Sequence, residues 1–122
     1  MKFEEILIEI MVLEDDAIDL IRKKSGRFRF PIYINENLYN TSIDALDLSA
    51  RASNCLEQAG YNTVGKLVEK IDRREDLKKL RNCGEKTMDE IMEQIFCFQY
   101  NQLKEDKKMK YIGRIWELNK SN

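Results

Sequence analysis

Histidine is absent from the 122-residue sequence, which also has only one proline and three cysteines. Without histidine the protein cannot form a Ser-His-Asp or Cys-His catalytic group, a histidine general base or a Cys2His2 zinc site. The glycine-rich patterns GxxxxGKS/T and GxGxxG, which cradle nucleotide phosphates, are missing as well. We therefore expect a protein that is not an enzyme and that needs no cofactor or metal ion.

The three cysteines are too few and too far apart for a sequence motif. Cys55, Cys83 and Cys97 lie 28 and 14 residues from one another and form no CxxC pair. This spacing indicates neither a metal cage nor a redox couple. An odd, sparse set of cysteines without an export signal is typical of a reducing compartment. We therefore expect a cytoplasmic protein.

Long apolar runs are also missing, since runs such as those at positions 6–8 and 10–13 have only three or four residues. A bilayer-spanning helix needs about 20 apolar residues, so no association with a membrane is expected. The 21 basic residues nearly balance the 22 acidic ones, and 43% of the residues are hydrophobic. This composition is typical of a soluble, foldable protein without a general affinity for nucleic acid, so any such binding must come from a local arrangement.

The sequence divides into an accessory section (residues 1–41), a central domain (residues 42–103) and a basic tail (residues 104–122). Apolar residues at helical spacing over residues 6–20, then three cations, Ser25 and Gly26, predict a helix with its C-terminal cap, although residues 6–13 would also suit a strand. Residues 28–34 alternate, but Pro31 cannot donate to a sheet, so we expect a sheet edge or an extended arm. Residues 35–41 are polar and predict a linker.

The central section contains clear signals for short helices. Ser42 precedes a single turn over residues 43–46, Ser49 precedes a helix to about Ala59 that Gly60 ends, and Thr63 precedes a third helix. A fourth helix starts at Asp72 or Arg73 and ends near residue 80, and a loop then leads into a long helix over residues 85–100. The apolar stripes of the two longer helices, which predict the core, are Ala52, Cys55, Leu56 and Ala59, and Met88, Ile91, Met92, Ile95 and Phe96.

The tail has two interpretations. Either it is an amphipathic basic helix that docks back on the domain, or it is a frayed extension interrupted at Gly113. Its lysines between residues 104 and 110 are expected on a solvated face. Aromatic residues near the tail could stack on bases, but core packing is the better explanation for Phe96, Phe98 and Tyr100.

The turn over residues 80–84 and the helix start that follows it form a candidate phosphate site. A helix N-terminus offers about four unpaired backbone N–H groups and a partial positive charge. Gly84 would let a phosphate approach the backbone, and Lys86 and Thr87 add a cation and a hydroxyl. Such a hairpin can bind a DNA backbone regardless of sequence. The alternative is that Gly84 only caps the helix.

A second candidate cluster lies on the helix that follows Ser49. Arg51 and Asn54 stand three residues apart on its polar face. An arginine there can enter a narrow minor groove, where the negative potential is deepest, and an asparagine can bond to phosphate or sugar. The alternative for Arg51 is an ordinary surface cation, or an ion pair with Asp47 or Glu57.

Residues 42–103 resemble the C-terminal domain of the bacterial RNA polymerase alpha subunit. Three blocks carry the resemblance, in order and in spacing: residues 43–56 (IDALDLSARASNCL), residues 63–68 (TVGKLV) and residues 76–91 (DLKKLRNCGEKTMDEI). The resemblance implies a mainly α fold, a compact bundle of four to five short helices related to the helix-hairpin-helix motif. The N-terminal helix and the short extended arm would be added to this bundle.

The resemblance also implies roles for individual residues. In this family an arginine and an asparagine of the first full helix, with the hairpin before the last helix, grip the minor groove of A·T-rich promoter DNA. Arg51 would then enter the groove, and an acidic position matching Glu90 would orient its basic neighbours. The residues expected at phosphates and sugars are Asn54, Asn82, Gly84, Lys86 and Thr87.

Other faces of the family domain contact RNA polymerase partners such as sigma factor, activators and redox regulators. The corresponding partner surface would comprise Asp72, Arg73, Arg74 and Glu75. This sequence has no counterpart of the large assembly domain of an alpha subunit. The resemblance therefore implies a free-standing relative, with the first section serving partner docking or a homodimer.

Departures from the family pattern support a second interpretation. Position 85, commonly basic in such hairpins, is Glu, and Cys83 stands where an aliphatic residue is usual. Residues 42–100 also carry nine basic and eleven acidic residues. The alternative is a protein-interaction module that mimics the domain and binds transcription regulators without DNA.

Overall fold

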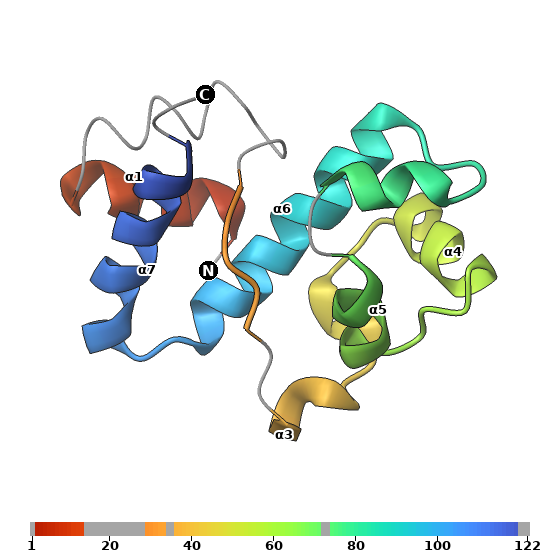
Figure 1. The fold of residues 1–122 in the computed structure, drawn as a ribbon, viewed down its shortest axis with the longest axis horizontal. Coiled ribbons are helices and arrows are strands. Elements are labelled where there is room, and N and C mark those ends of the chain that lie inside the picture. Colours follow the sequence, from red (N-terminus) through yellow and green to blue (C-terminus); the bar gives the residue numbers. More distant parts are fainter. Residues whose placement is uncertain (1, 14–28, 34–35, 72–73, 120–122) are drawn as a thin grey trace.

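The computed structural model describes residues 2–13, 29–33, 36–71 and 74–119, and within these residues it is mainly α-helical, with no strand (Figure 1). The predicted fold class is thus confirmed. The helices, with η marking 3-10 helices, are α1 (Phe3–Leu13), α3 (Glu36–Tyr39), η2 (Ile43–Leu46), α4 (Ala50–Gln58), α5 (Val64–Lys70), η3 (Arg74–Lys79), α6 (Glu85–Gln102) and α7 (Glu105–Asn119).

Hydroxyl caps start three of the central helices where the sequence predicts them. The Ser42 hydroxyl accepts the Asp44 N–H in η2, and the Thr63 hydroxyl accepts the Lys66 N–H in α5. Ser49 accepts the Ala52 N–H in the same way at the start of α4. Each cap satisfies a backbone donor that the helix itself cannot, which typically stabilises a helix by about 1 kcal/mol.

Helix α6 is the element on which both halves of the molecule are built. Its 18 residues cross the centre of Figure 1, with α1 and α7 on one side and α3, α4 and α5 on the other. It contacts α4, η2 and η3 as well as α1. A helix of this length is needed because it buries one face against the central domain and continues beyond it to hold the accessory elements.

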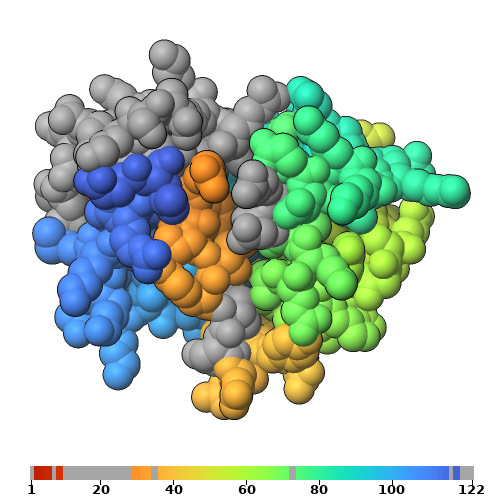
Figure 2. Space-filling view, viewed as in Figure 1, coloured from red at the N-terminus to blue at the C-terminus, as the bar shows by residue number. Residues whose placement is uncertain are grey.

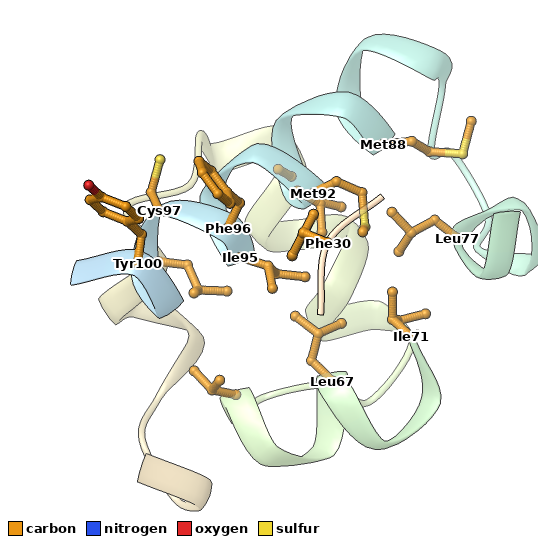
Figure 3. Close-up of a cluster of buried hydrophobic side chains, with 14 of the residues drawn as sticks. Phe30, Leu67, Ile71, Leu77, Met88, Met92, Ile95, Phe96, Cys97 and Tyr100 are labelled. Carbon is orange, nitrogen blue, oxygen red and sulfur yellow. The ribbon is translucent and has the colours of Figure 1, made fainter. Parts of the chain in front are cut away.

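The core runs without a break from the central domain into the accessory elements. Leu67, Ile71 and Leu77 meet the predicted α6 stripe at one end (Figure 3). At the other end, Phe96 lies among the rings of Phe3, Phe30, Tyr100 and Tyr111. The ring centroids of these four residues lie 5.6–6.3 Å from that of Phe96. Phe96 and Tyr100 are therefore core residues, as expected, and Phe98 is half-buried and packs against the core.

Residues 29–33 form the predicted extended arm and lie outside any sheet. The arm fills the space between α7 and the central helices (Figure 2). Gln99 holds it at two points, since its Nε2 donates to the Pro31 carbonyl at 2.6 Å and its Oε1 accepts the Tyr33 N–H at 2.7 Å. Tyr111 also donates to the Pro31 carbonyl, at 2.8 Å. Side chains of α6 and α7 thus make the hydrogen bonds to the arm backbone that a neighbouring strand would make in a sheet.

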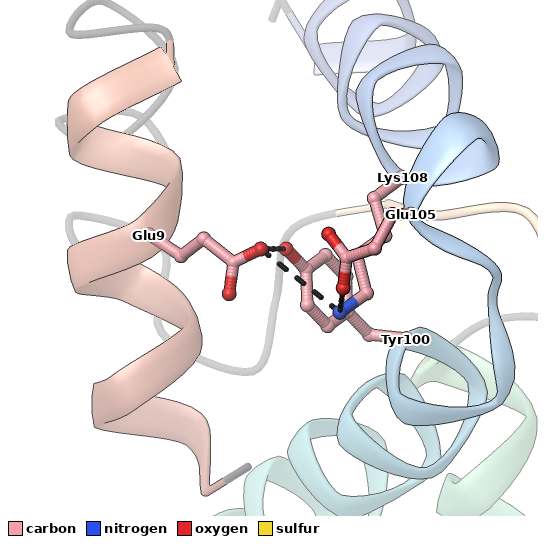
Figure 4. Close-up of polar contacts among 4 residues, drawn as sticks. All are labelled: Glu9, Tyr100, Glu105 and Lys108. Atoms are coloured by element: carbon pink, nitrogen blue, oxygen red, sulfur yellow. Dashed lines mark hydrogen bonds and ion pairs between the residues drawn. The ribbon is translucent and has the colours of Figure 1, made fainter.

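The tail forms helix α7 and docks, as one of the two interpretations predicts. Tyr111, Ile112 and Ile115 are buried, and the helix continues through Gly113. The prediction that the lysines of the tail lie on a solvated face is wrong for Lys108, which is only 9% exposed. Lys108 lies 3.0 Å from Glu105, 4.0 Å from Glu9 and 4.9 Å from the centroid of the Tyr100 ring (Figure 4). The Tyr100 hydroxyl donates to Glu9 at 2.8 Å, so this cluster joins α1, α6 and α7.

Two local predictions are wrong. The polar linker contains helix α3, which packs against α5 so closely that a Cβ on Gly65 would clash with the Tyr39 carbonyl. Ala59 is exposed rather than part of the α4 stripe, because it is the C-cap of the helix. The predicted helix end near Gly26 lies outside the described residues.

Candidate nucleic-acid interface

Helix α4, which carries Arg51, is fixed to α6 at its first turn. Both oxygens of Glu90 accept hydrogen bonds from Ser49, one from the backbone N–H at 2.6 Å and one from the hydroxyl at 2.8 Å. The same hydroxyl accepts the Ala52 N–H at 3.2 Å, so Ser49 is a cap and an anchor at once. Glu90 was expected to orient basic side chains; its contacts instead position α4, two residues before Arg51.

The hairpin between η3 and α6 is shaped by Asn82, which has a left-handed φ of 58°. Asparagine tolerates this conformation better than most other residues. The turn is also held to α4, because the Cys55 thiol donates to the Arg81 carbonyl at 3.5 Å. The two candidate clusters are therefore in direct contact.

One depression in the surface joins the two clusters. Its lining residues from α4 are Arg51, Asn54, Cys55 and Gln58, and those from the hairpin are Asn82 and Gly84. Arg51 is exposed, and Asn54 is exposed as well. The structure thus places an arginine, two asparagine side chains and the N-cap of a long helix around one opening.

Gly84 has no structural reason to be glycine. Its φ of −73° is accessible to any residue, and a Cβ added to it would meet no atom within 4 Å. Ser, Thr, Asp or Asn at this position would cap the helix with its own side chain. Glycine leaves the backbone open to close approach from outside, at the point where α6 begins.

Lys86 and Thr87 differ in their accessibility. Lys86 is exposed, whereas Thr87 is only 6% exposed. The expectation that the Thr87 hydroxyl meets a phosphate therefore needs correction, because the side chain is packed into the molecule. Its backbone N–H still belongs to the first turn, ahead of the first helical bond from Met88 to Gly84 at 2.9 Å.

The partner surface stays a prediction, and the structure describes only two of its four residues. Asp72 and Arg73 lie outside the described residues. The Arg74 side chain is 10% exposed, and its Nε donates to Asp89 at 2.6 Å. Arg74 therefore points to α6 rather than to a partner, while Glu75 is exposed.

Cys55 and Cys83 form a pair that their sequence spacing did not indicate. Cys55 is buried and Cys83 is half-buried in the hairpin, and the Cys55 thiol donates to the Arg81 carbonyl, two residues before Cys83. Burial, together with hydrogen bonding to the Cys55 thiol, raises the pKa of Cys83 to about 12. The spacing of the cysteines gave no sign of this contact, because the fold rather than the sequence separation creates it.

Two further observations concern all residues that the structure describes. No cluster of three or more potential metal ligands occurs among them. In the same residues, no helix is both long and apolar enough to cross a membrane.

Comparison with known proteins identifies the domain. A family model described as the C-terminal domain of the alpha chain of bacterial RNA polymerase matches residues 34–95. The DNA-directed RNA polymerase subunit alpha of Symbiobacterium thermophilum is 35% identical over 96 residues, which cover 78% of this sequence and 28% of that protein. The subunit alpha of Borrelia garinii subsp. bavariensis is 42% identical over 95 residues, 78% of this sequence and 25% of that protein.

The subunit alpha of Thermotoga maritima is 43% identical over 61 residues, covering 50% of this sequence and 18% of that protein. The protein thus spans less than a third of the length of these curated relatives. No solved structure matches it significantly. The matched residues contain α4 and the hairpin, and they make up just over half of the sequence. The protein therefore belongs to the family of the C-terminal domain of the bacterial RNA polymerase alpha subunit, a non-catalytic domain implicated in DNA binding and transcription.

Proposed function

We propose that this domain binds A·T-rich DNA in transcription, with Arg51 in the minor groove and the hairpin on the adjacent backbone. The observation that carries the proposal is the shared depression lined by Arg51, Asn54, Asn82 and Gly84. A guanidinium and a helix N-terminus that open to the same side can contact one duplex together. A single surface cation could not provide this arrangement.

The chemistry of the two clusters is complementary to a narrow groove. The minor groove of A·T-rich DNA is narrow and strongly negative, which attracts an inserted arginine. The N-terminal turn of α6 adds a partial positive charge and backbone N–H donors for a phosphate. The absence of a Cβ at Gly84 lets that phosphate come close.

The remaining residues would fix the position of the domain on the DNA. Asn54 and Asn82 would bond to phosphates or sugars, Lys86 would supply a phosphate contact, and Thr87 would contribute its backbone N–H only. Such contacts place a protein on a duplex without reading the sequence. With so few of them, the affinity of one domain would be about 10⁻⁴ to 10⁻⁶ M and would fall with salt. A homodimer, or contact with RNA polymerase, sigma factor or a regulator, would raise the effective concentration of the domain at DNA.

Titration of a fluorescent A·T-rich duplex tests the groove contact. Arg51→Ala should weaken binding by about 1–3 kcal/mol, or about 5- to 150-fold, because it removes the charge from the groove. The matched control is Lys110→Ala, which removes one exposed cation from α7, away from the depression. Equal affinity of the wild type and Arg51→Ala, or equal losses in both variants, would exclude the groove contact.

A second function is favoured by Glu85, which is exposed in the first turn of α6. A carboxylate at this position repels phosphate, and the excess of acidic residues over residues 42–100 does the same. The domain would then bind transcription regulators without DNA. A partner retained from a nuclease-treated bacterial lysate, together with no salt-dependent binding of any duplex, would favour this function over the first.

A further inference from the structure

The cysteine pair lies beside the candidate DNA interface and has no part in the function proposed above. Cys55 lines the depression from α4, and Cys83 stands between Asn82 and Gly84, which line it from the hairpin. The Cys55 thiol already bonds to the Arg81 carbonyl, two residues before Cys83. Both cysteines are free thiols. The fold therefore brings together two thiols that are 28 residues apart in the sequence.

We propose that Cys55 and Cys83 form an oxidisable dithiol, which a peroxide converts into an intramolecular disulfide that weakens the DNA grip. The disulfide is inferred from the contact of Cys55 with the hairpin that carries Cys83. Only its effect on DNA rests on the function proposed above.

The chemistry needs hydrogen peroxide as the oxidant and no other reagent. The Cys55 sulfur attacks one peroxide oxygen, the O–O bond breaks, and Cys55 becomes a sulfenic acid while one water leaves. The Cys83 sulfur then attacks the Cys55 sulfur, the S–O bond breaks, and the hydroxyl leaves as a second water with the Cys83 proton. Two thiols have lost two electrons and two protons, and one peroxide has been reduced to two waters. The atoms and electrons balance in the same way if Cys83 is oxidised first and Cys55 then attacks it.

The disulfide would change the geometry of the depression. Atoms in non-bonded contact are about 4 Å apart, whereas the two sulfurs of a disulfide are about 2.05 Å apart. Bond formation therefore draws the hairpin and α4 together by up to about 2 Å. Arg51 and Asn54 move with α4, and Asn82 and Gly84 move with the hairpin. Hydrogen bonds tolerate only a few tenths of an ångström, so a site suited to the duplex in its reduced form fits the same duplex less well when oxidised.

The disulfide itself is tested without DNA. The purified protein is treated with hydrogen peroxide, the remaining thiols are blocked with iodoacetamide, and the peptides are mapped by mass spectrometry. The expected product is a monomer with Cys55 joined to Cys83 and Cys97 alkylated after denaturation, and dithiothreitol should reverse the reaction. A map that shows no Cys55–Cys83 peptide, or that shows only disulfides between two molecules, overturns the proposal.

The effect on DNA is tested on the same samples with the fluorescent A·T-rich duplex. The oxidised wild type should bind at least about fivefold more weakly than the reduced form and should regain its affinity with dithiothreitol, whereas the matched control Cys83→Ala, which cannot form the disulfide, should lose less affinity than the wild type. Unchanged or tighter binding by the cross-linked wild type overturns the regulatory part of the proposal. If the reduced wild type binds no duplex, the function proposed above fails, while the peptide map still decides whether the dithiol exists.

Discussion

At the scale of single residues, the site depends on positions where the fold does not require the residue that is present. Arg51 is exposed at the start of α4, and Gly84 has an ordinary φ and empty space where a Cβ would be. Asn82 differs, because its left-handed φ of 58° shapes the hairpin and its side-chain amide is also available to DNA. A residue type that the fold does not require at its position indicates a role in binding.

Gly84→Ser separates stability from binding. Serine is at least as good an N-cap as glycine and restricts the unfolded state, so the free energy of unfolding should stay equal or rise by a few tenths of a kcal/mol. DNA binding should fall about fivefold, or by about 1 kcal/mol, because the side chain fills the approach to the backbone and its hydroxyl occupies an N–H of the turn. Urea denaturation and duplex titration measure the two effects. Undiminished affinity in a stable Gly84→Ser domain would mean that no phosphate approaches this glycine.

At the scale of elements, short helices are held by a few polar contacts between their ends. Glu90 joins α6 to the first turn of α4 through Ser49, and Gln99 joins α6 to the arm. Both residues lie on α6, so this helix determines where the other elements lie. The site is therefore sensitive to residues that would not contact DNA.

Glu90→Gln should weaken the anchor of α4. The substitution replaces one carboxylate oxygen by an N–H₂ group, which cannot accept from Ser49, and hydrogen bonds to charged groups contribute about 1.5–3 kcal/mol. We expect the free energy of unfolding to fall by about 1–3 kcal/mol. The control is Glu75→Gln on the exposed face of η3, which should change it by less than about 0.5 kcal/mol. Glu90→Gln and Ser49→Ala should also be non-additive, and strict additivity would rule out the anchor.

Gln99→Leu should release the arm. Leucine has nearly the volume of glutamine but can neither donate to the Pro31 carbonyl nor accept the Tyr33 N–H. Loss of a buried partner costs about 1–3 kcal/mol for each group left unsatisfied, although Tyr111 still donates to Pro31. The Tyr33 amide should exchange its hydrogen faster in the variant, as measured by NMR. Unchanged protection of that amide would show that packing alone holds the arm.

At the scale of the whole molecule, one core serves both the family domain and the elements around it. Ile6 of α1, Phe30 of the arm and Ile115 of α7 belong to the same buried cluster as Leu56 of α4. The accessory elements are thus packed parts of the domain. They lie around the buried side chains of Tyr100, Tyr111 and Cys97.

This burial predicts that the fold weakens at high pH. Burial raises the pKa of Cys97 to about 12, and burial also raises the pKa of Tyr111 and, with a hydrogen bond to Glu9, that of Tyr100. The unfolded protein releases these protons at about pH 9 to 10 while the folded protein keeps them, so stability is complete below about pH 9 and falls as the pH rises. Each group costs up to about 1.4 kcal/mol per pH unit.

Urea denaturation between pH 8 and pH 11 measures the high-pH effect. Tyr111→Phe removes one of the groups, so the variant should be less stable than the wild type at neutral pH but should lose less stability on going to high pH. A free energy of unfolding that does not change over this range would contradict the prediction.

The local structure of the central domain can be predicted from the order of its residues. The hydroxyls of Ser42, Ser49 and Thr63 each cap the helix that follows. The apolar residues of α6 recur every three or four positions, so they lie on one face of the helix. These signals act over four residues or fewer, so they can be read without knowing the fold. The same reasoning missed α3, because its position depends on contact with Gly65 and not on any local signal.

Contacts between residues far apart in the sequence depend on the packing of the folded protein. It placed Arg51 and Gly84 around one depression, joined Glu90 to Ser49, paired Cys55 with Cys83 and turned Arg74 toward Asp89. It also decided between the two interpretations of the tail and buried Lys108 against Tyr100. Each of these contacts depends on how α6 packs against its neighbours. Spacing along the sequence holds no information about such packing, because the elements that meet are joined by turns whose geometry is set by the core as a whole.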